Sequence, residues 1–212
     1  YNLGLTATLH DNPRLNGELT VYQNFINGYI YQVVGDPITT IRGVFLPWRF
    51  QQTDAVFRGV DATLDYALAP GWLLNGKAAL VRARNRALNS YMVYVPADRF
   101  ELSLRRDWAG RPAARLHHGF ALVRGTAVRR QTRVPGDVYD PQAAPAGYGL
   151  LSAELGATVR LGDVPVEVSL AGSNLLNERY RDYLNRFRYF ANDMGCNVTL
   201  RLHAPLNFGP RR

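Results

Sequence analysis

Residues 151–170 read LSAELGATVRLGDVPVEVSL, and this stretch decides the fold. Small or apolar residues alternate with polar ones through 151–161, and the alternation resumes at 166–170. Because successive side chains of a β-strand point to opposite faces, each half reads as a strand with one apolar and one polar face. Gly162-Asp163-Val164-Pro165 lies between them, and a proline and a glycine this close together predict a tight turn.

The same period of two recurs along the rest of the chain. It is clearest in 2–10, 60–68 and 198–208, and no segment of ordinary helix length shows a competing period of 3.6 residues. The pattern predicts about nine strands. Their expected ranges are 1–10, 17–33, 55–68, 73–84, 97–108, 113–132, 149–161, 166–174 and 196–208.

The connections between these strands alternate in length. Tight turns with a proline beside glycine or asparagine occur at Asp11–Arg14, Ala69–Trp72, Ala109–Pro112 and Gly162–Pro165. Long polar and aromatic stretches lie between them, near 34–54, 85–96, 133–148 and 175–195. Short turns at one end and long loops at the other are typical of transmembrane β-barrels.

Alternation alone also fits a soluble β-sandwich binding module, which puts apolar side chains inside and polar ones outside. Three features favour the barrel. Several strands approach the roughly 9–11 residues that cross a bilayer, charged residues recur on the polar face, and aromatic residues lie near strand ends. We therefore predict an all-β fold: an antiparallel transmembrane β-barrel segment of about nine strands, with the soluble sandwich as the alternative. No apolar run is long enough for a membrane helix.

The charge of the chain does not indicate nucleic-acid binding. The formal charge is +8 and the pI about 9.9, but the arginines are dispersed and Lys77 is the one lysine. A basic lumen or a surface facing lipopolysaccharide accounts for this charge. Cys196 is the single cysteine and cannot form an internal disulfide, so we interpret it as structural or incidental.

The sequence carries no constellation typical of an enzyme, so we expect neither catalysis nor a cofactor. Nucleophile-elbow, zinc-protease and phosphate-loop motifs are absent from the sequence. Asp61 and Asp65 share a strand face, but acids lining a lumen explain them. His117 and His118 point to opposite faces and cannot chelate one metal together. We predict no metal site.

The run Asn174–Phe187, NLLNERYRDYLNRF, resembles the motif that closes the barrel of TonB-dependent outer-membrane receptors, between the last two strands. Gly195 and a final strand ending in Phe208 continue the resemblance. Phe57–Tyr66 is similar to the Gly-x-Glu strand of that family, and Pro96–Phe100 to its proline-led entry into a later strand. The departures are Asp61 in place of Glu, Cys196 in place of a basic or polar residue, and a tail beyond Phe208.

This resemblance implies a Gram-negative outer-membrane barrel of about 22 strands around an N-terminal plug. Residues 1–208 would be the C-terminal portion of that barrel, and Gly209–Arg212 a short extension. We expect the plug and the remaining strands upstream of Tyr1, since nine strands is an odd number and no signal segment opens the chain. The tight turns would lie in the periplasm and the long loops outside the cell.

The resemblance also implies a function, which is TonB-driven import of a ferric siderophore, haem or another metal chelate. Further expected partners are outer-membrane lipid, lipopolysaccharide and the barrel-assembly machinery. A porin or adhesin that does not use TonB is the alternative within the membrane.

Candidate site residues follow from position and chemistry. Arginine binds anions and aromatic rings stack on planar groups, so such residues of the long loops are the expected ligand contacts. These are Arg42, Trp48, Arg49, Tyr91, Met92, Tyr94, Arg186 and Arg188. Charged residues of the polar strand face are expected to hold the plug, namely Glu101, Arg105, Glu154, Glu167 and Arg201.

Overall fold

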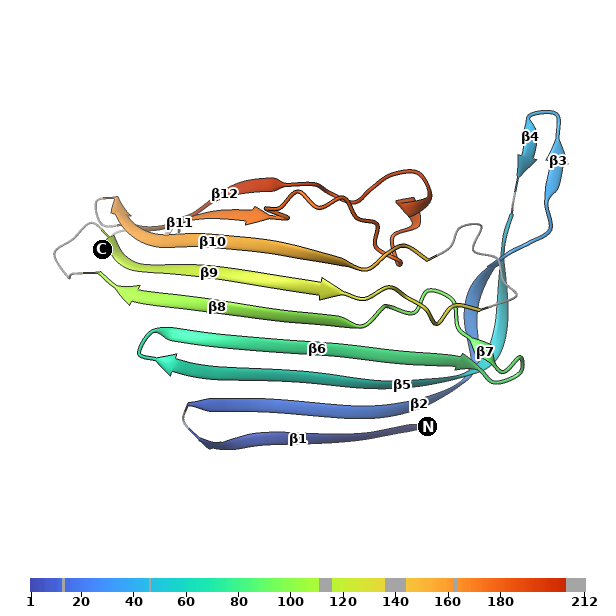
Figure 1. Cartoon of the computed structure of the whole chain (residues 1–212), viewed down its shortest axis with the longest axis horizontal. Helices are drawn as coiled ribbons and strands as arrows, with labels where there is room; N and C mark the ends of the chain where they lie inside the picture. Colours follow the sequence, from blue (N-terminus) through green and yellow to red (C-terminus); the bar gives the residue numbers. More distant parts are fainter. Residues whose placement is uncertain (13, 46, 111–115, 136–143, 162–163, 205–212) are drawn as a thin grey trace, which may run out of the picture.

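The computed structural model describes residues 1–12, 14–45, 47–110, 116–135, 144–161 and 164–204, and its main element is one antiparallel ten-stranded sheet. The sheet order is β1-β2-β5-β6-β8-β9-β10-β11-β12, with β7 paired to β6 (Figure 1). A second sheet holds β3 and β4. The strands are β1 Asn2–Asn12, β2 Leu15–Val34, β3 Ile38–Thr40, β4 Gly43–Phe45, β5 Trp48–Ala69, β6 Trp72–Asn85, β7 Ser90–Tyr91, β8 Arg99–Ala109, β9 Leu116–Val128, β10 Tyr148–Leu161, β11 Val164–Ser173 and β12 Asn197–His203.

The all-β prediction is confirmed, and the nine long strands lie where the alternation places them. Within the described ranges, no helix is long and apolar enough to cross a membrane. The short 3-10 helix η1 covers Arg186–Tyr189. The predicted ends at Phe208 and Gly209–Arg212 lie outside the described residues.

The stretch 34–54, expected to be a loop, is largely strand instead. β2 and β5 stay paired as far as Val34 opposite Trp48, and their extension carries the β3–β4 hairpin. The pairing register shifts between Ile26 and Tyr29, where Gly28 has φ +65. The extra residue of this bulge lies in β2, whose full length the expected strand 17–33 nearly covers. The expected strand 55–68 missed residues 48–54 of β5, where Gln51, Gln52, Thr53 and Asp54 are polar in succession and show no alternation. Figure 1 shows the extension turning away from the direction of the other strands at the long-loop end.

The pairing register separates the sheet into an apolar and a polar face. On the apolar face Leu64, Gly76 and Leu102 lie in one row, and on the polar face Thr63, Lys77 and Glu101 lie in the next. Residues of the apolar face are open to the surroundings, with exposed fractions of 72% for Leu5 and 57% for Leu155. An apolar surface this continuous is what a lipid-facing sheet presents.

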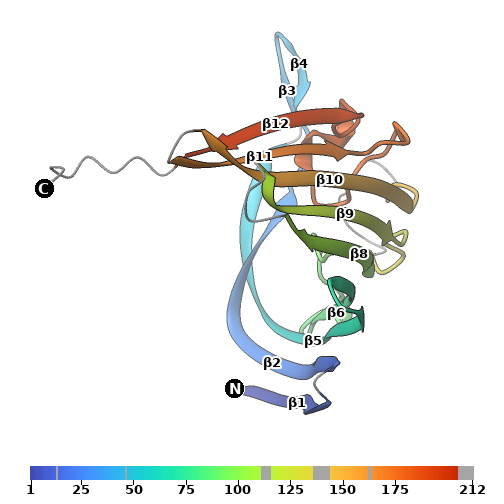
Figure 2. The same cartoon turned by 90° about the vertical axis from the view of Figure 1, so that its left-hand side faces the viewer.

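The sheet is curved, with the polar face on its concave side. Figure 2 shows the strands from β1 to β12 following an arc, with β1 and β12 as its two edges. Tyr22 and Asp61 of the polar face line one cavity with Asp182, Tyr183 and Leu184, which belong to the connection from β11 to β12. A connection from one end of the arc reaches strands near the other end only across the concave side.

A small hydrophobic core lies at the long-loop end of the sheet. Ala55 of β5 and Ala83 of β6 are buried there with Met92 and Val95 of the following connection. These positions belong to the polar-face register, so the segment carrying Met92 packs inside the arc. The core thus anchors a long connection over the concave side, near its mouth.

Three aromatic rings lie over glycines of the neighbouring strand. Tyr22 is paired with Gly59, Trp108 with Gly119 and Phe120 with Gly156. A Cβ added at any of these glycines would approach the facing ring to between 2.1 and 2.5 Å. The glycines therefore provide the space in which the rings lie flat on the sheet.

Replacing Gly59 by alanine is expected to destabilise the barrel by about 1–2 kcal/mol, because its Cβ would overlap the Tyr22 ring. Chemical unfolding of the protein in detergent micelles measures this loss. The double variant Gly59→Ala/Tyr22→Ala removes the overlap, so the two substitutions should couple strongly. Additive effects would show that the ring and the glycine do not share this space.

Candidate functional site

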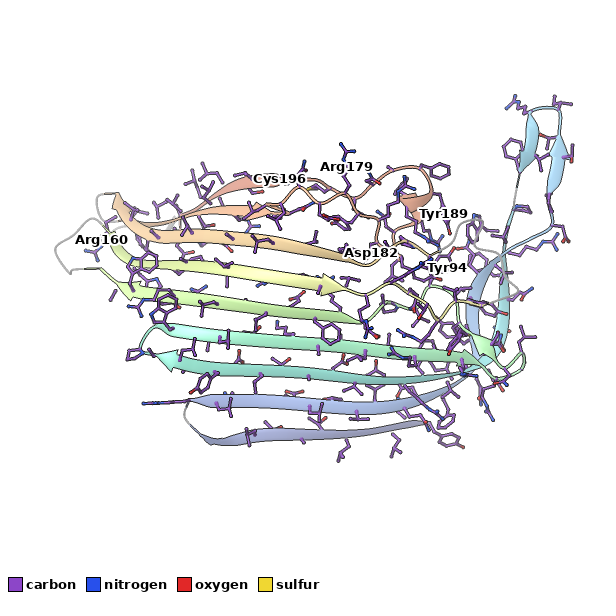
Figure 3. All side chains as sticks on the ribbon, viewed as in Figure 1. Tyr94, Arg160, Arg179, Asp182, Tyr189 and Cys196 are labelled. Atoms are coloured by element: carbon purple, nitrogen blue, oxygen red, sulfur yellow. The ribbon has the colours of Figure 1, made fainter. Side chains whose placement is uncertain are left out.

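The long-loop end of the concave side holds a ladder of arginine and aromatic side chains. We name it the arginine–aromatic cluster and define it as Trp48, Tyr94, Tyr183, Arg186, Arg188 and Tyr189. Its members come from the start of β5 and from two long connections, to which Tyr94 and Tyr189 in Figure 3 belong. The cluster is the place where the outer connections of the sheet meet.

Each arginine of the cluster lies between two aromatic rings. The Arg186 guanidinium lies 5.9 Å from the Trp48 ring centre and 5.6 Å from that of Tyr94. Tyr94 lies 6.4 Å from Tyr183, whose ring centre is 4.6 Å from the Arg188 guanidinium. Cation–π attraction of this kind holds each charge over a ring and favours one geometry for the whole ladder.

The backbone presents Trp48 and Tyr94 to the cluster. Trp48 opens β5 opposite Val34, which is buried. Tyr94 follows Met92 and precedes Val95, both core residues, and it has φ +55. A left-handed backbone conformation is unfavourable for a tyrosine. Burial of Met92 and Val95 on either side holds Tyr94 in this conformation.

Two asparagines shape the connection 175–195 that supplies the arginines. The Oδ1 of buried Asn174 accepts from the Glu178 amide at 2.8 Å, and its Nδ2 donates to the carbonyls of Glu178 and Met194 at 2.9 and 3.2 Å. Asn177 Oδ1 accepts from the Cys196 amide at 3.0 Å. Both asparagines have positive φ, which asparagine tolerates better than most residues. These bonds close the two ends of the connection on each other.

A polar network holds the middle of the same connection. The Tyr148 hydroxyl donates to Asp182 at 2.6 Å, and Asp193 accepts from the Asp182 amide at 2.7 Å and the Asn185 side chain at 2.6 Å. Asn185 also caps η1, the turn that carries Arg186 and Arg188. Burial, with the negative charges of Asp193 and Asp182, raises the pKa of Tyr180, so this ring stays neutral beside Tyr148.

Asp98 forms an ionic clamp at the same end of the sheet. It pairs with Arg82 at 2.6 Å and with Arg133 at 2.9 Å, and its side chain is 7% exposed. Burial alone would raise the pKa of Asp98, but the hydrogen bond from Arg82 and the charges of Arg133, Arg82 and Arg129 hold it below its ordinary value. The clamp joins β6 to the connections before β8 and after β9.

The structure brings together half of the eight proposed ligand contacts. Trp48, Tyr94, Arg186 and Arg188 meet in the arginine–aromatic cluster. The other four lie elsewhere. Arg42 lies in the β3–β4 turn, Arg49 lies against Gly35, Tyr91 lies under the Arg84 guanidinium, and Met92 is a core residue with 2% of its surface exposed.

The burial of Met92 has a simple physical reason. Its flexible side chain fills the space between Ala55 and Ala83, whose small size leaves a gap in the polar face. Sequence reasoning did not identify Tyr183 or Asp98 as part of this end of the molecule. Tyr183 stands within the Asn174–Phe187 motif and Asp98 within the Pro96–Phe100 stretch, so both resemblances offered a signal.

The five residues proposed to hold the plug lie on the polar face. Arg105, Glu154, Glu167 and Arg201 line one cavity near the tight-turn end, with His118 and His203 beside them. Arg201 lies 3.8 Å from Glu154 and His203 lies 3.5 Å from Glu167. Glu101 is farther along β8 and pairs with Arg99 at 2.8 Å. Alternating charges of this kind can bind a polar partner inside the arc.

Chemically, this arrangement is suited to binding. Arginine forks bind carboxylates and phosphates, and the rings beside them stack on planar groups. Among the described residues, no three histidine, cysteine, aspartate or glutamate side chains gather in a metal-binding group.

Comparisons with known proteins agree with the fold. Over residues 1–175, the chain matches the family model described as TonB dependent receptor-like, beta-barrel. The Asn174–Phe187 motif lies almost wholly beyond that range and is an independent likeness. No curated protein sequence matches the chain.

Two solved structures share the fold. One is titled copper transporter OprC, with a TM-score of 0.70 and 17% identity over 94% of this chain and 29% of that one. The other is P. aeruginosa FpvA bound to a pyoverdine and iron, with a TM-score of 0.54 and 16% identity over 94% of this chain and 26% of that one. This chain thus spans less than a third of either protein. Because the family model covers most of its length, the chain belongs to the TonB-dependent receptor β-barrel family.

Proposed function

We propose that this chain is the C-terminal portion of the barrel of an outer-membrane transporter that binds a metal chelate outside the cell and imports it with TonB. The observation that carries the proposal is the arginine–aromatic cluster at the mouth of the concave side. Family membership supports transport of a metal or metal chelate in general. The mechanism is binding followed by gated passage, without covalent chemistry.

The cluster favours a negatively charged chelate that carries planar groups. Arg186 supplies a guanidinium group, and Trp48 and Tyr94 supply stacking surfaces beside it. Arg188 and Tyr183 are buried, with 2% and 6% of their surface exposed, so they support the cluster from behind. Ferric siderophores and haem both combine negative charge with planar groups, so either class fits this chemistry. A ligand that enters between Trp48 and Tyr94 would replace the contacts of Arg186 with contacts of its own.

The remaining parts of the proposal concern the rest of the protein. The polar-face charges of Arg105, Glu154, Glu167 and Arg201 would hold a plug through ion pairs and water, and TonB would act on that plug. The apolar face would contact outer-membrane lipid, and the barrel-assembly machinery would insert the strands.

Trp48→Ala and Arg186→Ala are expected to weaken binding of the cognate chelate about tenfold each in the full-length receptor, because each removes one stacking or charged contact. Fluorescence quenching with a panel of ferric catecholate, ferric hydroxamate, haem and copper measures the affinity. Arg179→Ala is the matched control, since Arg179 is an exposed arginine of the same connection that points away from the cluster in Figure 3.

Uptake of the radiolabelled chelate by cells with and without TonB completes the test. Uptake that requires TonB and falls in the two cluster variants supports the proposal. Passive uptake that persists without TonB would indicate a porin instead. Binding that is lost equally in Arg179→Ala would show that the cluster has no special part in recognition.

A further inference from the structure

Tyr94 is the residue that joins the two halves of the arginine–aromatic cluster. The centre of its ring lies 6.2 Å from that of Trp48, 6.4 Å from that of Tyr183 and 5.6 Å from the Arg186 guanidinium. These neighbours come from the start of β5 and from the connection between β11 and β12. A displaced Tyr94 ring would therefore lose its contacts with both elements at once.

The backbone of Tyr94 needs an anchor on each side. Its φ of +55 is unfavourable for a tyrosine, so its neighbours must stabilise this conformation. Met92 is the anchor before the ring, because its side chain is buried and its amide donates to the Ala83 carbonyl at 3.0 Å. Val95 and Pro96 follow the ring, and proline has no amide hydrogen to donate. Both residues keep a carbonyl oxygen that accepts hydrogen bonds.

The side chain of Gln131 binds these two carbonyls. Its Nε2 donates to the Val95 carbonyl at 2.7 Å and to the Pro96 carbonyl at 3.0 Å, and its Oε1 accepts from the Arg133 amide at 3.1 Å. Carbonyl oxygens accept and an amide N–H donates, so the side-chain amide of Gln131 fits in one orientation. Gln131 has only 2% of its surface exposed, so water does not compete for these bonds.

Further bonds fix the segment that carries Gln131 against residues 95–98. The Arg129 amide donates to the Asp98 carbonyl at 2.9 Å, and the Arg133 side chain pairs with the Asp98 carboxylate at 2.9 Å. The connection after β9 thus contacts the one before β8 on both sides of Gln131. None of the six side chains that define the arginine–aromatic cluster belongs to the connection after β9, which acts on the cluster through the segment that it holds.

We propose that Gln131 is a positioning residue for chelate recognition. Its side-chain amide holds the two carbonyls next to Tyr94, and this keeps the Tyr94 ring at stacking distance from Trp48 and Arg186. The inference rests on the proposed function, because it takes the cluster as the chelate site. Rings that are held in place before binding need no further ordering when the ligand arrives, so the affinity is higher.

A double-mutant cycle in the full-length receptor tests the role in recognition. Gln131→Met keeps the approximate shape of the buried side chain and removes its hydrogen bonds, and Tyr94→Ala removes the ring. Fluorescence quenching with ferric catecholate, ferric hydroxamate, haem and copper measures the affinities. We expect each single variant to bind the cognate chelate about tenfold more weakly. The double variant should bind no more weakly than Tyr94→Ala, because Gln131 acts through that ring.

Two further variants complete the set. Gln51→Met is the matched control, since Gln51 accepts from the Tyr31 hydroxyl at 3.1 Å but is exposed, and its affinity should equal that of wild type. Gln131→Glu is the second variant should Gln131→Met fail to fold. Its side chain still accepts from the Arg133 amide and lacks the donor to Val95 and Pro96, so it should show the same loss.

A measurement without ligand tests the position of the ring itself. Fluorotyrosine in place of Tyr94 reports its surroundings by fluorine NMR of the receptor in micelles. We expect one resonance in the wild-type background and in Gln51→Met. In Gln131→Met the resonance should be shifted or divided, because the ring samples more than one position. Identical spectra for the wild-type and Gln131→Met backgrounds would overturn the proposal.

The outcomes separate this inference from the proposed function. Wild-type affinity in Tyr94→Ala would contradict the chelate site, and with it any role of Gln131 in recognition. Weak binding by Tyr94→Ala together with normal binding by Gln131→Met would overturn the inference alone. A double variant whose loss equals the product of the two single losses would also overturn it, because Gln131 would then act independently of Tyr94.

Discussion

Asn174→Ala is expected to release the connection 175–195, at a cost of about 3 kcal/mol. The substitution leaves the Glu178 amide and the carbonyls of Glu178 and Met194 without their side-chain partner, and each lost bond costs about 1 kcal/mol. It also places alanine at φ +48, which asparagine tolerates better. Because Asn174 is 3% exposed, water replaces these bonds only if the turn opens.

Hydrogen exchange of the Glu178 amide in the full-length receptor measures this release. We expect exchange to be about 100-fold faster in the variant, with the strands of the sheet still protected. Asn174→Gly separates the two causes, because glycine accepts the positive φ and lacks the side chain. If Asn174→Gly matched wild type, the hydrogen bonds would be unimportant and the backbone conformation would account for the whole effect.

Asp98→Asn is expected to destabilise the barrel by about 2 kcal/mol at neutral pH. Removing one member of a buried ion pair costs about 3–5 kcal/mol, and the cost is smaller here because the side chains of Arg82 and Arg133 are 36% and 20% exposed. Glu101→Gln is the matched control. Its pair with Arg99 is more exposed, at 21% and 50%, and it should change stability little.

The effect of Asp98→Asn should depend on pH in one direction. The folded protein holds the pKa of Asp98 below its ordinary value of 3.8. The stabilisation that ionised Asp98 contributes is therefore fully present above pH 3.8. It is lost as the pH falls through the lower pKa that Asp98 has in the folded protein. Unfolding of both proteins in micelles between neutral and strongly acidic pH should show their difference shrinking at the acidic end. A difference that grows on acidification would show that Asp98 is not held by its arginines.

The strands could be predicted from the sequence because one apolar and one polar face impose a period of two. Residues 151–161 and 164–170 lie in β10 and β11, which pair as far as Leu161 opposite Val164, while Gly162 and Asp163 of the predicted turn lie outside the described residues. The polar-face position of Glu154 and Arg201 followed from the same alternation. Family membership agrees with the resemblance found at Asn174–Phe187.

The arrangement of the long connections could not be predicted in this way. The first residues of β5 show no alternation, because Gln51 to Asp54 are all polar, so Trp48 could be assigned to a loop but not to the start of a strand. Arg186 reaches Trp48 and Tyr94 through contacts between residues far apart in the chain, which no local pattern encodes. The position of Met92 in a long connection suggested a ligand contact, but its side chain packs with Ala55 and Ala83 and is a core residue.

The rings that lie on glycines have a consequence for how the strands find their partners. A slip of one residue would turn every side chain to the wrong face, and hydrophobicity opposes that error. A slip of two residues keeps the faces correct, so hydrophobicity does not oppose it. Such a slip would move Tyr22 from Gly59 onto Asp61 or Phe57, and Phe120 from Gly156 onto Glu154 or Thr158. Each pair of ring and glycine thus disfavours a slip of two residues, an alignment error that the alternating pattern would accept.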